Sequence, residues 1–199
     1  MARYLQSFKY FDGDIKYQVK ELFQFRNEIK SEAISYLNEL KTMQGEGPVT
    51  VVGIHFRRGD LLAENRMNFP PYAYFSRAME QLSPSDSKTI FITVGSKEDL
   101  DWVKVQSVFQ QPNVFYSESV ENEKVLDLAL LANCDHVITT IGTFGWWAGW
   151  LSGGTVIYYK DQFDMKHPVH HNKIILEDYF PKEWIGLTNV GLGLEESDK

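Results

Sequence analysis

The stretch Val49–Leu62, which reads VTVVGIHFRRGDLL, constrains the fold of this chain more than any other stretch. Its first half is apolar and rich in β-branched residues, which predicts a buried strand. The polar residues that follow directly are His55, Arg57, Arg58 and Asp60. In open α/β sheets, ligands bind at the carboxyl edge of the strands. Two arginines at such an edge predict a binding site for an anion.

Strand-like and helix-like patterns alternate along most of the chain, which is typical of a parallel, doubly wound sheet. The predicted strands are Val49–His55, Thr89–Val94, Asn113–Tyr116, Val137–Thr140 and Thr155–Tyr159. The predicted helices are Ile15–Met43, Tyr72–Leu82, Lys97–Val105, Leu126–Ala132 and Trp146–Leu151. The pattern of the first helix, Ile15–Met43, allows a break near Arg26–Asn27. We therefore predict an α/β fold in which residues 49–186 form a Rossmann-like domain. Residues 1–48 are expected to form an extended segment and a long helix packed on that domain, and residues 187–199 a tail.

Composition narrows the class of ligand. The chain has 199 residues, which suffice for one well-buried domain or for a large domain with an appendage. Its net charge of -7 argues against a double-stranded nucleic acid as partner, because such a partner needs a basic face. Arg57 and Arg58 therefore indicate a focused anion site. The single cysteine, Cys134, lies in an apolar run and is expected to be a buried thiol.

A second anion-binding pattern follows the predicted strand Val137–Thr140. The tight turn Gly142-Thr143-Phe144-Gly145 leads into a helix and would place backbone N–H groups and the Thr143 hydroxyl at a helix N-terminus. This spacing alone is a weak signal. It gains weight because the same predicted sheet contains the strand that ends in Arg57 and Arg58. The small-residue turn Gly95-Ser96, after the second strand, is weaker evidence of the same kind.

Asp127 lies near the start of the predicted helix Leu126–Ala132 and has two interpretations. An acid in the first turn is favourable to the helix dipole, whatever the function of the protein. A carboxylate can also accept hydrogen bonds from both N1–H and N2–H of guanine, an adjacent pair of donors that adenine and uracil do not present. The residue pattern leaves both interpretations open.

Two other motifs also have a structural and a functional interpretation. Asp12-x-Asp14 fits a metal-binding pattern of some sugar transferases, but such a motif normally ends an apolar strand. A helical pattern follows here, so an N-cap is the preferred interpretation. The Trp146-Trp147-x-x-Trp150 cluster could stack on sugar rings, but its helical spacing favours packing in the core.

Taken together, the two anion-binding regions resemble the α-1,2-fucosyltransferases of glycosyltransferase family 11. The motif His55-Phe56-Arg57-Arg58-Gly59-Asp60 is shared more widely among fucosyltransferases, whereas the region from Asp127-Leu128-Ala129-Leu130-Leu131 through Thr143-Phe144-Gly145-Trp146-Trp147-Ala148 is specific to the α-1,2 group. Tyr4-Leu5-Gln6-Ser7, Gly153-Gly154 and Glu183-Trp184 extend the resemblance over nearly the whole chain.

The resemblance implies the donor-binding half of a GT-B-like fold. It also implies inverting transfer of fucose from GDP-fucose, without a metal or other cofactor, to a galactose hydroxyl of a glycan acceptor. Arg57 would hold the β-phosphate, Arg58 would support it or pack nearby, and His55 would line the nucleotide site. The phosphates would also bind Thr143 and the N–H groups of Phe144 and Gly145, while Asp127 would read guanine. Asp60 would orient the arginines; the base is open, with Asp60 and Glu64 as candidates by location.

The sequence departs from the family ahead of the Tyr-Leu-Gln stretch. Family members carry there a membrane anchor, a stem and a further region, and the resemblance implies a location in the Golgi membrane. This chain shows no apolar segment of signal or membrane length. Because a GT-B site lies between two domains, we expect the chain to supply mainly the donor half. A nucleotide-sugar-binding protein without transferase activity is therefore the alternative hypothesis.

Overall fold

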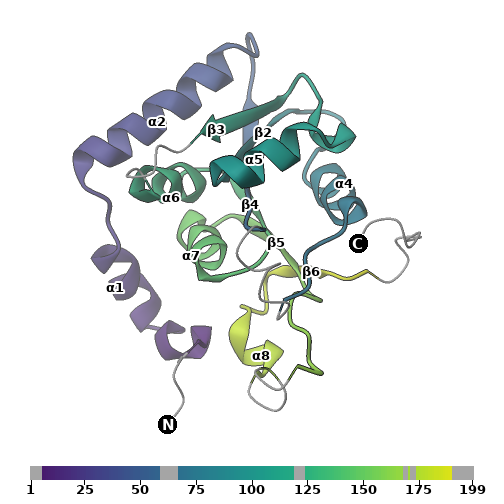
Figure 1. The fold of residues 1–199 in the computed structure, drawn as a ribbon. Coiled ribbons are helices and arrows are strands. Elements are labelled where there is room, and N and C mark those ends of the chain that lie inside the picture. Colours follow the sequence, from purple (N-terminus) through teal and green to yellow (C-terminus); the bar gives the residue numbers. More distant parts are fainter. Residues whose placement is uncertain (1–5, 59–66, 119–123, 168–169, 171–173, 190–199) are drawn as a thin grey trace.

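A computed structural model describes residues 6–58, 67–118, 124–167, 170 and 174–189. Its centre is one parallel sheet with the strand order β3-β2-β1-β4-β5-β6 (Figure 1). The strands are β1 (Val49–His55), β2 (Lys88–Gly95), β3 (Val114–Glu118), β4 (His136–Thr139), β5 (Thr155–Tyr159) and β6 (Ile185–Leu187). The predicted α/β fold and all of the predicted strands are confirmed. The sequence did not predict β6, because a strand of three residues is too short to show a periodic pattern.

Helices cover both faces of this sheet. The α-helices are α1 (Ile15–Leu22), α2 (Asn27–Thr42), α4 (Tyr72–Gln81), α5 (Lys97–Lys104), α6 (Lys124–Ala132), α7 (Thr143–Ser152) and α8 (Leu176–Tyr179). Two 3-10 helices, η1 (Phe8–Phe11) and η2 (Ser107–Phe109), complete the described elements. The predicted helix Ile15–Met43 is broken between α1 and α2, close to the predicted position.

The side chains of β1 alternate between two hydrophobic clusters, one on each face of the sheet. Val52 and Ile54 pack in the cluster that contains α4, whereas Val51 packs with α2 and α6. Figure 1 shows the same division, with α2 lying alongside α6 and α4 on the other side. Because successive side chains of a strand point to opposite faces, His55 shares its face with Val51 and is directed toward the side that carries α6 and α7.

Hydrogen bonds fix the ends of the strands and helices near the centre of the sheet. The buried Tyr74 hydroxyl of α4 donates to the backbone oxygen of Thr139 at 2.7 Å and holds the end of β4. Cys134 is buried, as predicted, and its thiol donates to the Leu130 carbonyl. Burial is also the main cause that raises the pKa of this thiol, so it is an inert structural group.

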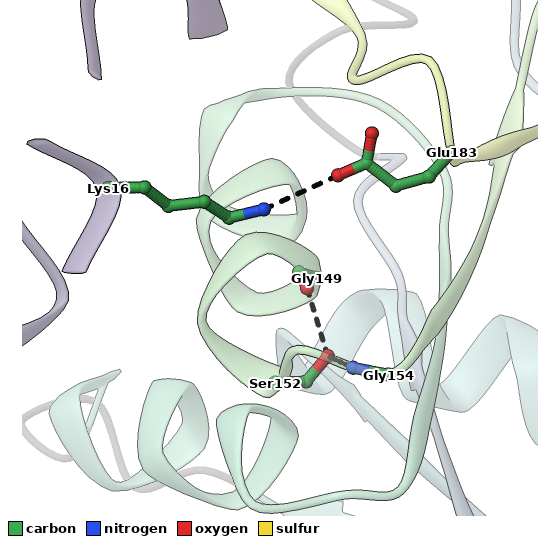
Figure 2. A network of polar contacts seen from close by, with 5 residues as sticks. All are labelled: Lys16, Gly149, Ser152, Gly154 and Glu183. Atoms are coloured by element: carbon green, nitrogen blue, oxygen red, sulfur yellow. Dashed lines mark hydrogen bonds and ion pairs between the residues drawn. The ribbon is translucent and has the colours of Figure 1, made fainter. Parts of the chain in front are cut away.

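The C-terminal end of α7 is capped by residues at and directly after its end. Gly153 adopts the left-handed conformation with φ 72°, which glycine tolerates best. Figure 2 shows the Ser152 hydroxyl donating to the Gly149 carbonyl and accepting from the Gly154 N–H. The same view shows Lys16 of α1 paired with Glu183 at 3.4 Å, which links α1 to the segment before β6.

Two tryptophans of α7, Trp146 and Trp150, belong to the core, as predicted, whereas Trp147 is half-buried. Trp146 and Trp150 are buried together with Phe8 of η1 and with Trp184. The prediction of an N-cap at Asp12-x-Asp14 is right in position, because Asp14 is the N-cap residue of α1. Within the described residues, the Asp14 side chain makes no capping hydrogen bond. No helix in the described part of the chain is long and apolar enough to cross a membrane.

Candidate functional site

The order of the strands reverses between β1 and β4, and this switch point defines the candidate site. Chain connections lead from β1 toward β2 and β3 on one side, and from β4 toward β5 and β6 on the other. His55 at the end of β1 pairs in register with Thr139 at the end of β4. Ligands of open α/β sheets bind in the crevice that forms at such a point, outside the carboxyl ends of the strands.

Arg57, which follows β1, lies against the turn between β4 and α7. A Cβ atom added to Gly142 would come within 3.1 Å of Arg57 Nη1 and 3.5 Å of Arg57 Cδ, so the arginine passes close to the glycine backbone. Gly142 also has φ 92°, which disfavours other residues. The two predicted anion-binding segments therefore meet at one place, the N-terminus of α7.

The structure corrects the prediction for the residues after Gly142. The sequence predicted a tight turn over Gly142–Gly145 and a helix from Trp146, but α7 begins at Thr143. Thr-Phe-Gly has a weak helical propensity, which tertiary packing overrides here. Thr143 is exposed in the first turn, and Gly142 at the N-cap has no side chain to satisfy the first N–H groups. The first turn of α7 contains no acid, so its dipole and N–H donors are suited to an external anion.

His55 fills the space under this first turn. Its ring stacks on Phe144 with 5.2 Å between the ring centroids. A Cβ atom on Gly145 would lie 2.6 Å from His55 Nδ1 and 2.2 Å from Thr139 Oγ1, which explains why a glycine is needed there. Within the described part of the chain, His55 Nδ1 is buried without a hydrogen-bond partner. Burial, reinforced by the charge of Arg57, lowers the pKa of His55 to about 3, so the imidazole is neutral at neutral pH.

Arg58 has different surroundings from Arg57. Its guanidinium lies over the ring of Trp102 in α5 at 4.8 Å and over Phe69 at 5.8 Å, distances typical of cation–π contacts. Its backbone N–H donates to Asp99 Oδ1 at 3.0 Å. The two adjacent arginines thus contact different neighbours, Arg57 the β4–α7 turn and Arg58 the first turns of α5.

Asp99 is a site residue that the sequence analysis missed. It is buried in the first turn of α5, where its second oxygen accepts from the Ser96 hydroxyl at 2.8 Å and its N–H donates to that same hydroxyl at 3.2 Å. The pattern Ser96-x-x-Asp99 is close to a capping box, and this signal could have identified it. The contact to Arg58 could not have been found this way, because it joins residues 41 positions apart.

The structure also places Asp127, whereas two other predicted residues lie outside its described range. Asp127 is buried in the first turn of α6, the helix that follows β3, and therefore lies on the same edge of the sheet. A buried carboxylate is uncommon and consistent with either interpretation of this residue. Asp60 and Glu64 fall in the segment that the structure does not describe. Among the described residues, no group of three or more His, Cys, Asp or Glu side chains could hold a metal ion.

This arrangement is typical of one class of proteins. A parallel sheet with a 3-2-1-4-5-6 order, an arginine and an uncapped helix N-terminus at its switch point is the architecture of nucleotide-binding α/β proteins. The sequence model of Glycosyl transferase family 11 matches residues 2–188. The chain therefore belongs to glycosyl transferase family 11, as the sequence resemblance indicated.

The names of similar proteins agree with this family assignment. Galactoside alpha-(1,2)-fucosyltransferase 1 from Homo sapiens is 30% identical over 179 residues, which cover 87% of this chain and 48% of the human protein. Galactoside alpha-(1,2)-fucosyltransferase 2 from Oryctolagus cuniculus is 27% identical over 188 residues, covering 90% of this chain and 51% of the rabbit protein. The chain spans about half the length of the curated relatives it matches.

A solved structure shares the fold. The glycosyl transferase family 9 protein from Veillonella parvula DSM 2008 superposes with a TM-score of 0.52 at 15% sequence identity, covering 87% of this chain and 44% of that chain. This likeness supports the predicted GT-B-like architecture of the sheet and its helices.

Proposed function

We propose that this chain provides the donor-binding half of a galactoside α-1,2-fucosyltransferase. The reaction would move L-fucose from GDP-fucose to the 2-hydroxyl of a galactose in a glycan acceptor, with inversion and without a metal. The family and the names of the relatives support the reaction class. The single observation that carries the donor site is the approach of Arg57 to Gly142 at the N-terminus of α7.

The proposed chemistry is an in-line displacement. The acceptor oxygen attacks the anomeric carbon, the bond from that carbon to the β-phosphate oxygen breaks, and GDP leaves with the electron pair. Negative charge therefore grows on the β-phosphate, where fixed cations and dipoles lower the barrier. Arg57 supplies the cation, with a fork of donors that matches phosphate. Arg58 packs nearby, with its guanidinium over Trp102. The Thr143 hydroxyl and the N–H groups of Phe144 and Gly145 supply the dipoles.

His55 has a different role in this proposal. A neutral imidazole adds no charge to the phosphate site, so His55 acts by packing under Phe144 and Gly145 and by lining the nucleotide site. The proton of the acceptor hydroxyl must pass to a base. Asp60 and Glu64 are the candidates. Asp60 is also proposed to orient the arginines, because it follows Arg58 by two residues and Arg57 by three.

Asp127 is proposed to read the base of the nucleotide. Its carboxylate would accept from N1–H and N2–H of guanine, which adenine lacks as a pair. Calorimetric titration with GDP and with ADP tests this role. The parent chain is expected to prefer GDP by roughly tenfold or more, and Asp127→Asn to lose most of that preference. Asp101→Asn, an exposed change on α5, is the charge-matched control. Equal preference for GDP in parent and Asp127→Asn would leave this residue as a helix-dipole partner only.

Titration with GDP-fucose tests the donor site as a whole. Arg57→Ala removes a charged hydrogen bond to phosphate, which is expected to weaken binding by between about tenfold and hundredfold. A circular dichroism spectrum of the variant controls for folding. If the parent chain does not bind GDP-fucose, or if Arg57→Ala binds it equally well, the donor site is placed wrongly.

Transfer is tested separately from binding. Radiolabelled fucose should move from GDP-fucose to a galactose-terminated acceptor, and an excess of chelator should not stop it if the reaction needs no metal. The alternative is a nucleotide-sugar-binding protein without transferase activity. Donor binding without transfer would support that alternative. The Golgi membrane remains the proposed location, through the family alone.

A further inference from the structure

A pocket of about 70 Å³ lies beside the N-terminus of α7. Its walls are formed by four aromatic residues, Phe11, Trp146, Trp147 and Tyr179. Gln6, Ser7 and Thr143 add polar groups to the lining. The volume is well below the roughly 300 Å³ at which pockets begin to enclose whole small-molecule ligands. The pocket therefore fits one part of a larger ligand.

The pocket is placed on the opposite face of α7 from α6. Phe144 and Ala148 pack toward the cluster that contains α6, whereas Trp146 and Trp150 pack with η1 and α8. Asp127, the proposed reader of guanine, is in the first turn of α6. A ligand whose base lies at α6 and whose diphosphate lies at the N-terminus of α7 would continue, beyond its terminal phosphate, toward this pocket.

The walls of the pocket are held in place by contacts between their own residues. The indole N–H of Trp146 donates to the Tyr179 carbonyl at 2.8 Å, which ties α7 to α8. Phe11 stacks on Trp147 with 5.3 Å between centroids and meets the edge of Trp146 at 5.7 Å. Such a rigid wall loses little conformational entropy when a ligand binds.

We propose that this pocket receives the sugar ring of the nucleotide sugar. A pyranose presents C–H groups that suit aromatic walls, and a 6-deoxyhexose carries an apolar methyl group in place of the hydroxymethyl group of other hexoses. Gln6, Ser7 and Thr143 supply partners for the remaining hydroxyls. The inference rests on the proposed function, because it takes the diphosphate to bind at the N-terminus of α7.

Calorimetry with two ligands, GDP and GDP-fucose, isolates the sugar contact. Phe11→Leu removes an aromatic wall and is expected to weaken GDP-fucose binding roughly fivefold with GDP binding unchanged. Phe23→Leu is the matched control, since Phe23 also stacks on Trp147, at 4.6 Å, but does not line the pocket. Gln6→Ala changes an exposed residue, so a sugar-specific loss in this variant cannot result from misfolding.

The possible outcomes separate this inference from the proposed function. A parent chain that binds neither ligand overturns both. A parent chain that binds GDP, with Phe11→Leu and Gln6→Ala changing GDP and GDP-fucose affinity equally or not at all, overturns the sugar pocket alone. The sugar pocket is also overturned if these two variants change only the Michaelis constant for the galactoside acceptor, because that result would assign the pocket to the acceptor. A loss specific to GDP-fucose in Phe11→Leu and absent from Phe23→Leu supports the proposal.

Discussion

The turns β2–α5 and β4–α7 lie on either side of β1 and have the same topology, yet their helix N-termini are satisfied in opposite ways. Ser96 caps α5, and the first turn of that helix contains Glu98 and Asp99. α7 begins after Gly142 and contains no acid in its first turn. The positive end of α5 thus has internal partners, whereas that of α7 lies next to Arg57 and is suited to a negative ligand.

The difference also explains the use of glycine in the two turns. A Cβ atom on Gly95 would come within 3.0 Å of the Phe56 carbonyl, so this glycine lets the β2–α5 turn pack against the chain that follows β1. Gly142 instead lets the Arg57 side chain approach the start of α7. The weak sequence evidence for a ligand at Gly95-Ser96 therefore has a structural explanation. The β4–α7 turn is the candidate for ligand binding.

The comparison is tested most strongly by giving α7 an acid like those of α5. Thr143→Asp places one at the first position of α7, where it suits the helix dipole, so thermal stability should be unchanged or slightly higher. A unit charge about 5 Å from a phosphate, at an effective dielectric constant of about 20, costs about 3 kcal/mol. GDP binding measured by calorimetry should fall roughly a hundredfold. Thr143→Asn is the uncharged control, and equal affinities for GDP in the two variants would contradict an anion site at α7.

A smaller effect is expected when the side-chain contacts at the N-terminus of α5 are removed. Asp99→Ala removes the acceptor of the Arg58 N–H and of the Ser96 hydroxyl, which should lower the free energy of unfolding by about 2 kcal/mol. Because Asp99 positions the chain next to Arg57, GDP affinity should fall as well.

Two further variants sharpen this test. Asp99→Asn keeps an oxygen for the Arg58 N–H and should restore most of the GDP affinity. Asp101→Ala removes an exposed charge from the same helix and should change neither quantity. If Asp99→Ala lost stability in urea titrations and kept full GDP affinity, Asp99 would be a structural residue without a role in positioning the arginines.

The last prediction concerns His55 and the pH dependence of stability, with no ligand involved. In the unfolded chain this histidine takes up a proton near pH 6.5, but in the folded protein its pKa is lowered to about 3. Between these values only the unfolded state gains the proton, so stability falls as the pH drops from 6.5 toward 3, by at most about 1.4 kcal/mol per pH unit. Urea unfolding from pH 7.5 to 4.5 should show a smaller loss for His55→Asn than for the parent chain. Parallel curves would mean that His55 is protonated in the folded state.

Local sequence signals were sufficient for most elements of the sheet. β1 and β2 were predictable because short apolar runs that are rich in β-branched residues and bounded by turn residues favour a strand buried on both faces. β6 and α8 were not, since segments of three and four residues carry no period and form only against neighbours already in place. The start of α7 was also missed, because packing of Gly145 on His55 and Thr139 decides it.

The sequence by itself determined that two arginines and a glycine turn would reach one edge of a parallel sheet, because strand polarity and chain order fix which ends meet. Only the tertiary structure decided that Arg57 contacts Gly142 while Arg58 lies over Trp102 and beside Asp99. Adjacent residues carry the same chemical signal in a sequence. Their side chains are separated by contacts between segments far apart along the chain, and those contacts exist only once the sheet has brought the segments together.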